Sequence, residues 1–224
     1  MRRIAFLLVA VLAGSAGAAP AKSARPAKAR QARTASFTGH NAPKAEYRTE
    51  PLGKPSGDLW FRAENLGEQV RVNIYKPDGN FDDAALAKLD DLFRCVSTGK
   101  VRAVRAELYE QLSRIQDHFD HKTLVLVSGF RAAIGSTVER TSSRHYHASA
   151  ADFRIEGVSI YEIRKYAESL DMGNMGIGIY PTSQFVHVDF RAPGEPSYRW
   201  VDNSGHGKPA KRPGRTQPAR KPVS

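Results

Sequence analysis

The sequence of 224 residues contains a single cysteine, so no internal disulfide can stabilise its fold. Cys95 lies within residues 89–96, a run with the apolar spacing of a helix. We expect Cys95 to pack as a small buried apolar residue and not to act as a catalytic nucleophile. The sequence also lacks internal repeats, and its length suits one domain of ordinary size with extensions at its ends.

No apolar run in the sequence is long enough to span a membrane. The most apolar stretch, residues 4–12, follows two arginines and precedes a small-x-small pattern that ends at Ala18. This order is typical of a secretory signal peptide, which we expect to cover residues 1–18 and to be removed after Ala18. The mature protein is therefore expected to be exported, either to the periplasm or to the medium, without a transmembrane segment.

Acidic residues are almost absent from both ends of the sequence. Fifteen of the 34 Lys and Arg residues, but only Glu46 among the acids, lie outside residues 49–202. The ends therefore carry a formal charge of +14 and residues 49–202 a charge of −3, which together give the net charge of +11. Such segments cannot bury enough apolar surface to fold, and we expect disorder over residues 19–57 and again over residues 203–224. For an exported protein the polyanions in reach are anionic envelope polymers and lipid head groups, which we favour as partners over nucleic acid.

Hydrophobic periodicity predicts both strands and helices between these ends. Strands are expected at residues 59–63, 70–75, 123–127, 152–155 and 185–190, and helices from 82 or 83 to about 98, from about 102 to 118, and from 159 to 170. Ser159 and Glu162 have the spacing of a capping box at the start of the last helix. Residues 132–141 are expected to form a mobile loop beside a cleft.

His145, Asp152 and His187 are residue types that bind zinc. The first two are seven positions apart, and His187 follows thirty-five residues after Asp152 in an apolar run that favours a strand. Three protein ligands leave a fourth position for water, which is the arrangement of a catalytic zinc site. Spacing alone does not separate this interpretation from hydrogen-bonded structural histidines, and a pair of His145 with His147 is a further alternative.

Short motifs around these residues resemble those of a known enzyme family. The S-x-H-x-x-G-x-A-x-D pattern of the zinc D-Ala-D-Ala peptidases, whose fold is shared with Hedgehog, is similar to the pattern of Ser143, His145, Ala148, Ala150 and Asp152. Residues 128–131, Ser-Gly-Phe-Arg, resemble the family's S-G-[YF]-R motif, and residues 185–189 resemble its closing strand. The murein endopeptidase K branch, also called YcbK-like, is the most similar because its last motif also reads H-x-D.

The resemblance implies roles for individual residues. It implies that the three residues named above as zinc ligands bind Zn²⁺. It also implies that Arg131 holds a substrate carbonyl oxygen or the negative charge that develops on it. Ser143 is expected to form a hydrogen bond within the site. His147, at an unmatched position of the motif, is expected to line the cleft or to support a ligand.

The sequence departs from the family pattern at two places. Related peptidases carry an acid or a histidine shortly before the last ligand as general base, where this chain has Gln184 and Phe185. Asp189 is the nearest ionisable candidate, and it is either the base or a carboxylate that orients a ligand imidazole. The second departure is Ala148 in place of glycine, which narrows the turn before Asp152.

The resemblance implies an α+β fold over about residues 58–202, with an antiparallel sheet and helices packed on one side. It implies a zinc-dependent peptidoglycan endopeptidase that hydrolyses cross-linking peptides of the cell wall. A D-Ala-D-Ala carboxypeptidase is the alternative within the same family. A zinc-bearing module that binds the cell envelope without turnover is the alternative of another class, and the missing general base favours it.

Overall fold

The computed structural model describes residues 36–133 and 142–205. In these residues the chain forms eight strands, three α-helices and one short 3-10 helix, η1 (Lys44–Glu46). The predicted signal peptide, most of the predicted mobile loop and most of the C-terminal extension lie outside the described residues. No helix in the described part of the chain is long and apolar enough to cross a membrane.

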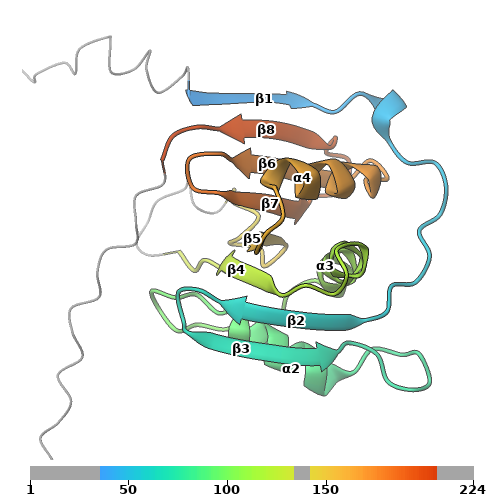
Figure 1. Cartoon of the computed structure of the whole chain (residues 1–224), viewed down its shortest axis with the longest axis vertical. Helices are drawn as coiled ribbons and strands as arrows, with labels where there is room; N and C mark the ends of the chain where they lie inside the picture. The colour runs from blue at the N-terminus through green and yellow to red at the C-terminus, as the bar shows by residue number, and fades with distance from the viewer. Residues whose placement is uncertain (1–35, 134–141, 206–224) are drawn as a thin grey trace, which may run out of the picture.

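All eight strands join one sheet (Figure 1). In spatial order they are β1 (Phe37–Asn41), β8 (Tyr198–Asp202), β6 (Met175–Tyr180), β7 (Phe185–Phe190), β5 (Ala150–Ile155), β4 (Leu124–Ser128), β2 (Asp58–Ala63) and β3 (Glu68–Asn73). Most neighbours are antiparallel, whereas β2 with β4 and β6 with β8 are parallel pairs. The structure confirms the predicted α+β class and adds two parallel pairs to the sheet.

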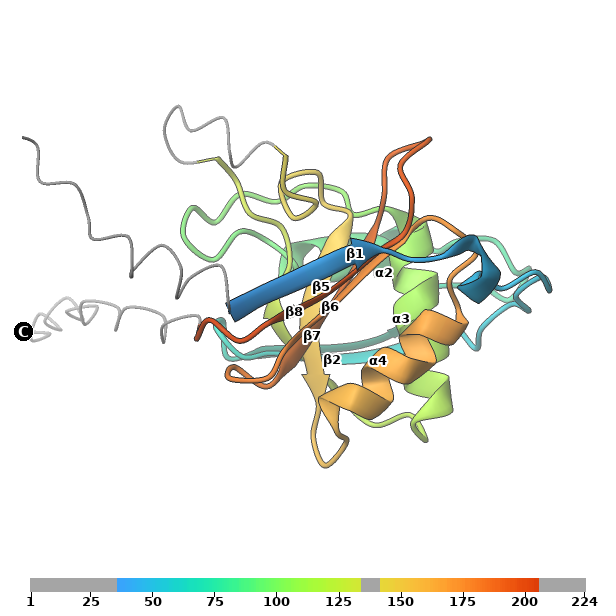
Figure 2. The ribbon, with the colours of Figure 1, turned by 90° about the horizontal axis from the view of Figure 1, so that it is seen from above.

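Alternation along the strands gives the sheet two chemically different faces. Phe61, Phe153 and Val188 belong to the face that forms one apolar core with the helices. Figure 2 shows α3 (Ala106–His118) and α4 (Ile160–Ser169) together on this side of the sheet. Asp152 and His187 sit between core residues along their strands, so their side chains point to the opposite face.

Two helices begin where a side chain satisfies the free N–H groups of the first turn. Helix α2 (Asp83–Leu92) follows Asp82, whose carboxylate accepts hydrogen bonds from two backbone N–H groups. At the start of α4, Ser159 and Glu162 form the capping box that their spacing predicts. Apolar side chains on one stripe of each helix then pack onto the sheet.

Helix α2 ends at Leu92, earlier than the predicted residue 98. Its next residue, Phe93, accepts a hydrogen bond from the backbone N–H of Phe130 at 2.7 Å. Gly129 lies against the same backbone, because a Cβ at this position would be 2.6 Å from the Phe93 carbonyl oxygen. The end of α2 therefore anchors residues 128–131, and the glycine of that motif is required by close packing.

Cys95 is buried, as its surroundings in the sequence predict. It belongs to a small apolar cluster with Phe130 and Ala148. This cluster fills the space between the end of α2 and the loop that carries His145.

The predicted disorder is wrong for residues 36–57, which the structure describes. Strand β1 pairs with β8 along its whole length, from Phe37 opposite Asp202 to Asn41 opposite Tyr198. All five residues of β1 are exposed. Pairing at a sheet edge uses backbone hydrogen bonds and requires no buried side chain, so composition gives no sign of it. Just beyond the pair of Phe37 and Asp202, the N–H of Asn203 donates to the carbonyl oxygen of Ser36 at 2.7 Å.

Candidate metal centre

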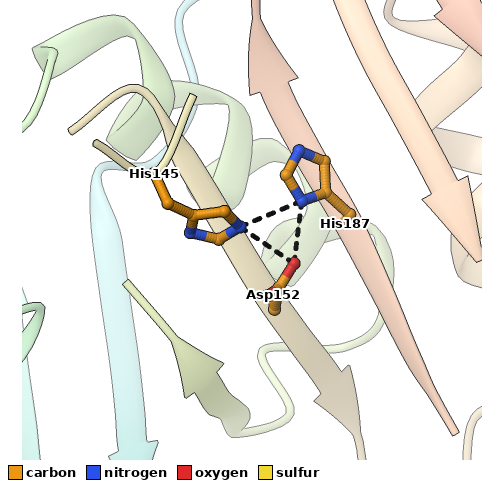
Figure 3. Close-up of side chains that lie close together, drawn as sticks. All are labelled: His145, Asp152 and His187. Carbon is orange, nitrogen blue, oxygen red and sulfur yellow. Dashed lines mark hydrogen bonds and ion pairs between the residues drawn. The ribbon is translucent and has the colours of Figure 1, made fainter. Parts of the chain in front are cut away.

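The sheet and one loop bring the three predicted ligands together. In the sheet register, Asp152 of β5 lies directly opposite His187 of β7. His145 comes from the loop before β5, which is held in a tight turn by a hydrogen bond from the N–H of Ala148 to the carbonyl oxygen of His145. Figure 3 shows the three side chains converging on one point. All three residues are buried.

The potential ligand atoms form a compact triangle. Nδ1 of His187 is 2.8 Å from Oδ1 of Asp152, and Nε2 of His145 is 3.2 Å from the same oxygen and 3.1 Å from Nδ1 of His187. Within the described residues this is the one group of three or more histidine, cysteine or acidic side chains that could hold a metal ion.

The triangle has the size of one face of a metal coordination tetrahedron. Zinc–nitrogen bonds of about 2.0 Å in tetrahedral geometry place neighbouring ligand atoms about 3.3 Å apart. The three measured separations, from 2.8 to 3.2 Å, are close to this value without any rotation of the side chains. Two imidazoles and one carboxylate can therefore hold a divalent metal ion on three sides and leave the fourth side open.

The orientation of His145 makes Nε2 available as a ligand atom. Its Nδ1–H donates to the carbonyl oxygen of Gly129 at 2.7 Å. This hydrogen bond fixes the proton on Nδ1 and leaves a lone pair on Nε2, which faces Asp152.

The orientation of His187 directs Nδ1 toward Asp152 and His145. Its Nε2–H donates to Oδ2 of Asp189 at 2.9 Å. Asp189 is buried and approaches Gly176 so closely that a Cβ on this glycine would lie 2.2 Å from Oδ2. Oδ1 of Asp189 has no hydrogen-bond partner in the described part of the chain. The carboxylate thus holds the imidazole from the side opposite Asp152.

Burial and neighbouring charges set the protonation of the site. Burial raises the pKa of Asp152, but the charges and hydrogen bonds of His145 and His187 outweigh it and hold the pKa well below its usual range. Burial keeps the pKa of His145 below its ordinary value, although Asp152 opposes this effect. Burial also lowers the pKa of His187, but the hydrogen bonds to Asp152 and Asp189 prevail and raise the pKa to about 9.

Arg131 lies beside the predicted ligands, as its place in the sequence motif suggests. Its Nη2 donates to Asp152 and to Nε2 of His145, the latter at 3.0 Å. Its Nε donates to Oγ of Ser128 at 2.9 Å, which fixes the plane of the guanidinium. About half of the side chain is exposed (53%), so the guanidinium is accessible to a ligand.

Ser143 and His147 lie in the same loop but outside the group of three. The backbone carbonyl of Ser143 accepts a hydrogen bond from the N–H of Tyr146 at 3.0 Å, and its side chain is half-buried. His147 is exposed, and its ring packs edge-on against that of Tyr146. The alternative pairing of His145 with His147 in one metal group is absent from the described residues, where the group consists of His145, Asp152 and His187.

The backbone conformation at Ala148 explains why the family motif has glycine at this position. Its φ angle is +51°, in the left-handed region that favours glycine. The methyl group is buried with Cys95 and Phe130. Packing of this methyl group offsets part of the backbone strain, and the loop retains the turn that delivers His145.

Trp200 contacts the site, although no motif in the sequence identifies it as a site residue. Its ring centroid is 4.9 Å from that of His187. The contact crosses Gly178, which lies opposite His187 on one side and Trp200 on the other. A Cβ at Gly178 would lie 2.0 Å from the indole. The signal in the sequence was the pair Gly176 and Gly178 in one apolar strand, which indicates close approach but does not identify the approaching side chain.

Comparison with known proteins agrees with this geometry. The family described as peptidoglycan L,D-endopeptidase MepK matches residues 55–193. These residues include both histidines and the aspartate of the site. No solved structure matches the chain significantly.

Curated proteins with the same description are similar over most of their length. The probable peptidoglycan L,D-endopeptidase MepK of Haemophilus influenzae is 35% identical over 140 residues, which are 58% of this chain and 74% of that protein. The peptidoglycan L,D-endopeptidase MepK of Escherichia coli K12 is 34% identical over 133 residues, which are 56% of this chain and 71% of that protein.

Proposed function

The chain belongs to the family of peptidoglycan L,D-endopeptidase MepK, and from this membership we propose that it is a zinc-dependent endopeptidase that hydrolyses cross-linking peptides of peptidoglycan. The observation that carries the proposal is the triangle of His145, Asp152 and His187, whose ligand atoms lie within 4.8 Å of one another. The names of the relatives support cleavage of a bond between an L- and a D-residue.

Zinc is the metal that we propose for the site. Two imidazole nitrogens and one carboxylate oxygen suit this ion, and the separations of these atoms match its tetrahedral geometry. Bound zinc would act as a Lewis acid that polarises a peptide carbonyl and lowers the pKa of water.

Arg131 has the position of a substrate-binding group. Its guanidinium is held by Ser128 and Asp152 and is half exposed, so it can donate a hydrogen bond without reorganising. We assign it to the carbonyl oxygen of the scissile bond, where negative charge develops during attack by water.

Asp189 has the geometry of a positioning group. It accepts the Nε2–H of His187, on the ring side that faces away from Asp152, and it is fully buried. Of the two roles considered for it, orientation of the imidazole is therefore better supported than proton transfer. We propose that Asp189 keeps His187 in the tautomer whose Nδ1 faces the metal position.

The proposed substrate agrees with the remainder of the chain. Cell-wall peptides lie outside the cytoplasm, and the sequence of residues 1–18 has the pattern of a signal peptide. We therefore propose that the protein is exported and that the basic segments at its ends bind anionic polymers of the envelope. The peptidase unit of this proposal covers residues 58–202, with the strand β1 added at its edge.

Digestion of purified cross-linked muropeptides tests this function. Dimers joined through an L,D bond and dimers joined through a D,D bond are incubated with the protein, with and without a chelator, and the products are identified by mass spectrometry. We expect monomers from the L,D-linked dimer, no cleavage with chelator, and recovery when zinc is restored. Release of free D-alanine would instead identify a carboxypeptidase, and binding without any product would identify an envelope-binding module.

A further inference from the structure

Two arginines and one glutamate form a charged cluster next to the metal centre. Arg144, which precedes His145 in the sequence, donates to a carboxylate oxygen of Glu195. Nε of Arg191 is 3.7 Å from the same oxygen, and Nη1 of Arg191 is 3.5 Å from Oδ2 of Asp189. Asp189 in turn accepts the Nε2–H of His187. The cluster therefore extends from the surface to Asp189, the residue that orients the predicted metal ligand His187.

The three side chains differ in exposure and in the way they are held. The side chains of Arg144 and Arg191 are 17% and 21% exposed, whereas that of Glu195 is 43% exposed. The guanidinium of Arg191 lies over the ring of Tyr198, 5.6 Å from its centroid. Glu195 stands at the end of a turn that is closed by a hydrogen bond from its own N–H to the carbonyl oxygen of Ala192. Arg191 is thus held by Tyr198 and Asp189, whereas the guanidinium of Arg144 is paired with Glu195, which is supplied by a surface turn.

The turn and the loop of the metal centre lie on the same side of the molecule. In Figure 2 the connection between β7 and β8 projects on the side of the sheet that faces away from α4, as does the loop that carries His145. The ion pair between Arg144 and Glu195 joins the two segments.

From this arrangement we propose that Arg144 and Arg191 form a binding site for a free carboxylate of the substrate peptide, and that Glu195 occupies this site until the substrate displaces it. The inference rests on the proposed peptidase function and extends it to recognition. It assigns one anchoring point of the peptide to the side of His187 that faces away from Asp152.

Three observations support a carboxylate as the ligand. Guanidinium groups bind carboxylates through planar, charge-assisted hydrogen bonds, and the group that now occupies the site is itself a carboxylate. Nε of Arg191 is buried and lacks a hydrogen bond in the described part of the chain, so one donor is left for a better-placed acceptor. An ion pair with a side chain as exposed as that of Glu195 contributes little stability, so its displacement costs little.

Calorimetric titration of the full chain with a muropeptide monomer tests the proposal without requiring turnover. Two probes are compared, one with free carboxylates and one in which the carboxyl groups have been converted to amides. We expect the wild type to bind the free acid on the order of tenfold more tightly than the amide, because a charge-assisted hydrogen bond is lost. Arg144→Gln should weaken binding of the free acid to the level of the amide, and Glu195→Gln should strengthen it.

A second ion pair supplies matched controls. Arg94 is paired with Glu68 at similar exposure, 19% and 47%, on another part of the surface. Arg94→Gln and Glu68→Gln should leave both affinities unchanged. Equal binding of the two probes by the wild type, or equal affinities of the Arg144→Gln and Arg94→Gln variants for the free acid, would overturn the proposal. Cleavage of cross-linked dimers is scored separately, so loss of the proposed function is not confused with loss of this site.

Discussion

At the scale of single residues, the hydrogen bond between Asp189 and His187 distinguishes a positioning carboxylate from a general base. Replacing Asp189 by asparagine removes the negative charge but keeps the shape of the side chain. We expect Asp189→Asn to weaken metal binding by about ten- to a hundredfold, because the imidazole loses the partner that fixes its tautomer. Metal titration of the chelator-treated variant measures this change.

The same variant should recover most of its turnover when metal is in excess. If Asp189 were the base, turnover would stay low at every metal concentration while the affinity for metal remained that of the wild type. Comparison of the two titrations, metal content against cleavage rate, separates these outcomes.

The raised pKa of His187 predicts that metal binding depends on pH. Below a pKa of about 9 the metal-free imidazole is protonated, and a metal ion must displace that proton. The apparent affinity should therefore rise about tenfold for each pH unit between pH 7 and pH 9 and level off above it. Competition with a chromogenic chelator at several pH values measures this slope, and an affinity that is constant over the range would contradict the assignment of His187.

At the scale of elements, the contact of β6 with β8 depends on Gly178. A methyl group at this position would overlap the indole of Trp200, which also packs against His187. We expect Gly178→Ala to lower the free energy of unfolding by about 1–3 kcal/mol, because the ring cannot move without disturbing its neighbours. Urea denaturation measures the change.

Gly53 provides the control for this substitution. A Cβ at Gly53 would have no neighbouring atom within 4 Å. Gly53→Ala should therefore change the free energy of unfolding by less than about 0.5 kcal/mol. Equal stability of the two variants would show that the close packing at Gly178 does not limit the fold.

The sequence was sufficient to predict the strands and helices whose apolar side chains follow a clear period. Strand β7 matches its predicted range, and the capping box at Ser159 correctly marked the start of α4. Strand β1 was missed because pairing at a sheet edge is a backbone interaction, and the inner strands β6 and β8 were missed as well. The parallel pairing of β2 with β4 was also unpredicted, since strand order depends on contacts between segments far apart in sequence.

The sequence motifs predicted the metal ligands and the neighbouring arginine, because these motifs consist of the residue types that the chemistry requires. His145, Asp152 and His187 do converge, and Arg131 does lie beside them. The partners that orient the ligands could not be read in the same way. The carbonyl oxygen of Gly129 is a backbone atom. The contacts of Trp200 and Glu195 arise only when β8 and the turn before it fold onto the sheet.

At the scale of the whole molecule, the two faces of the sheet have different roles, since one packs against the helices and the other carries the candidate metal centre. The apolar core lies between one face and the helices, and the candidate metal centre lies on the other face. We therefore expect the metal-free protein to stay folded, with an unchanged far-ultraviolet circular dichroism spectrum after chelation. Its thermal midpoint should fall, because a ligand that binds only the folded state stabilises it. Loss of the helical signal on chelation would show instead that the metal is needed for folding.

The central claim is that one metal ion is held by two imidazoles and one carboxylate. Elemental analysis of purified protein tests it most directly, with His187→Ala as the variant and His121→Ala as the control, since His121 is exposed and paired with Asp117 on α3. The account predicts about one zinc per chain in the wild type and in His121→Ala, and none in His187→Ala. Stoichiometric zinc in His187→Ala, or no transition metal in the wild type, would contradict it.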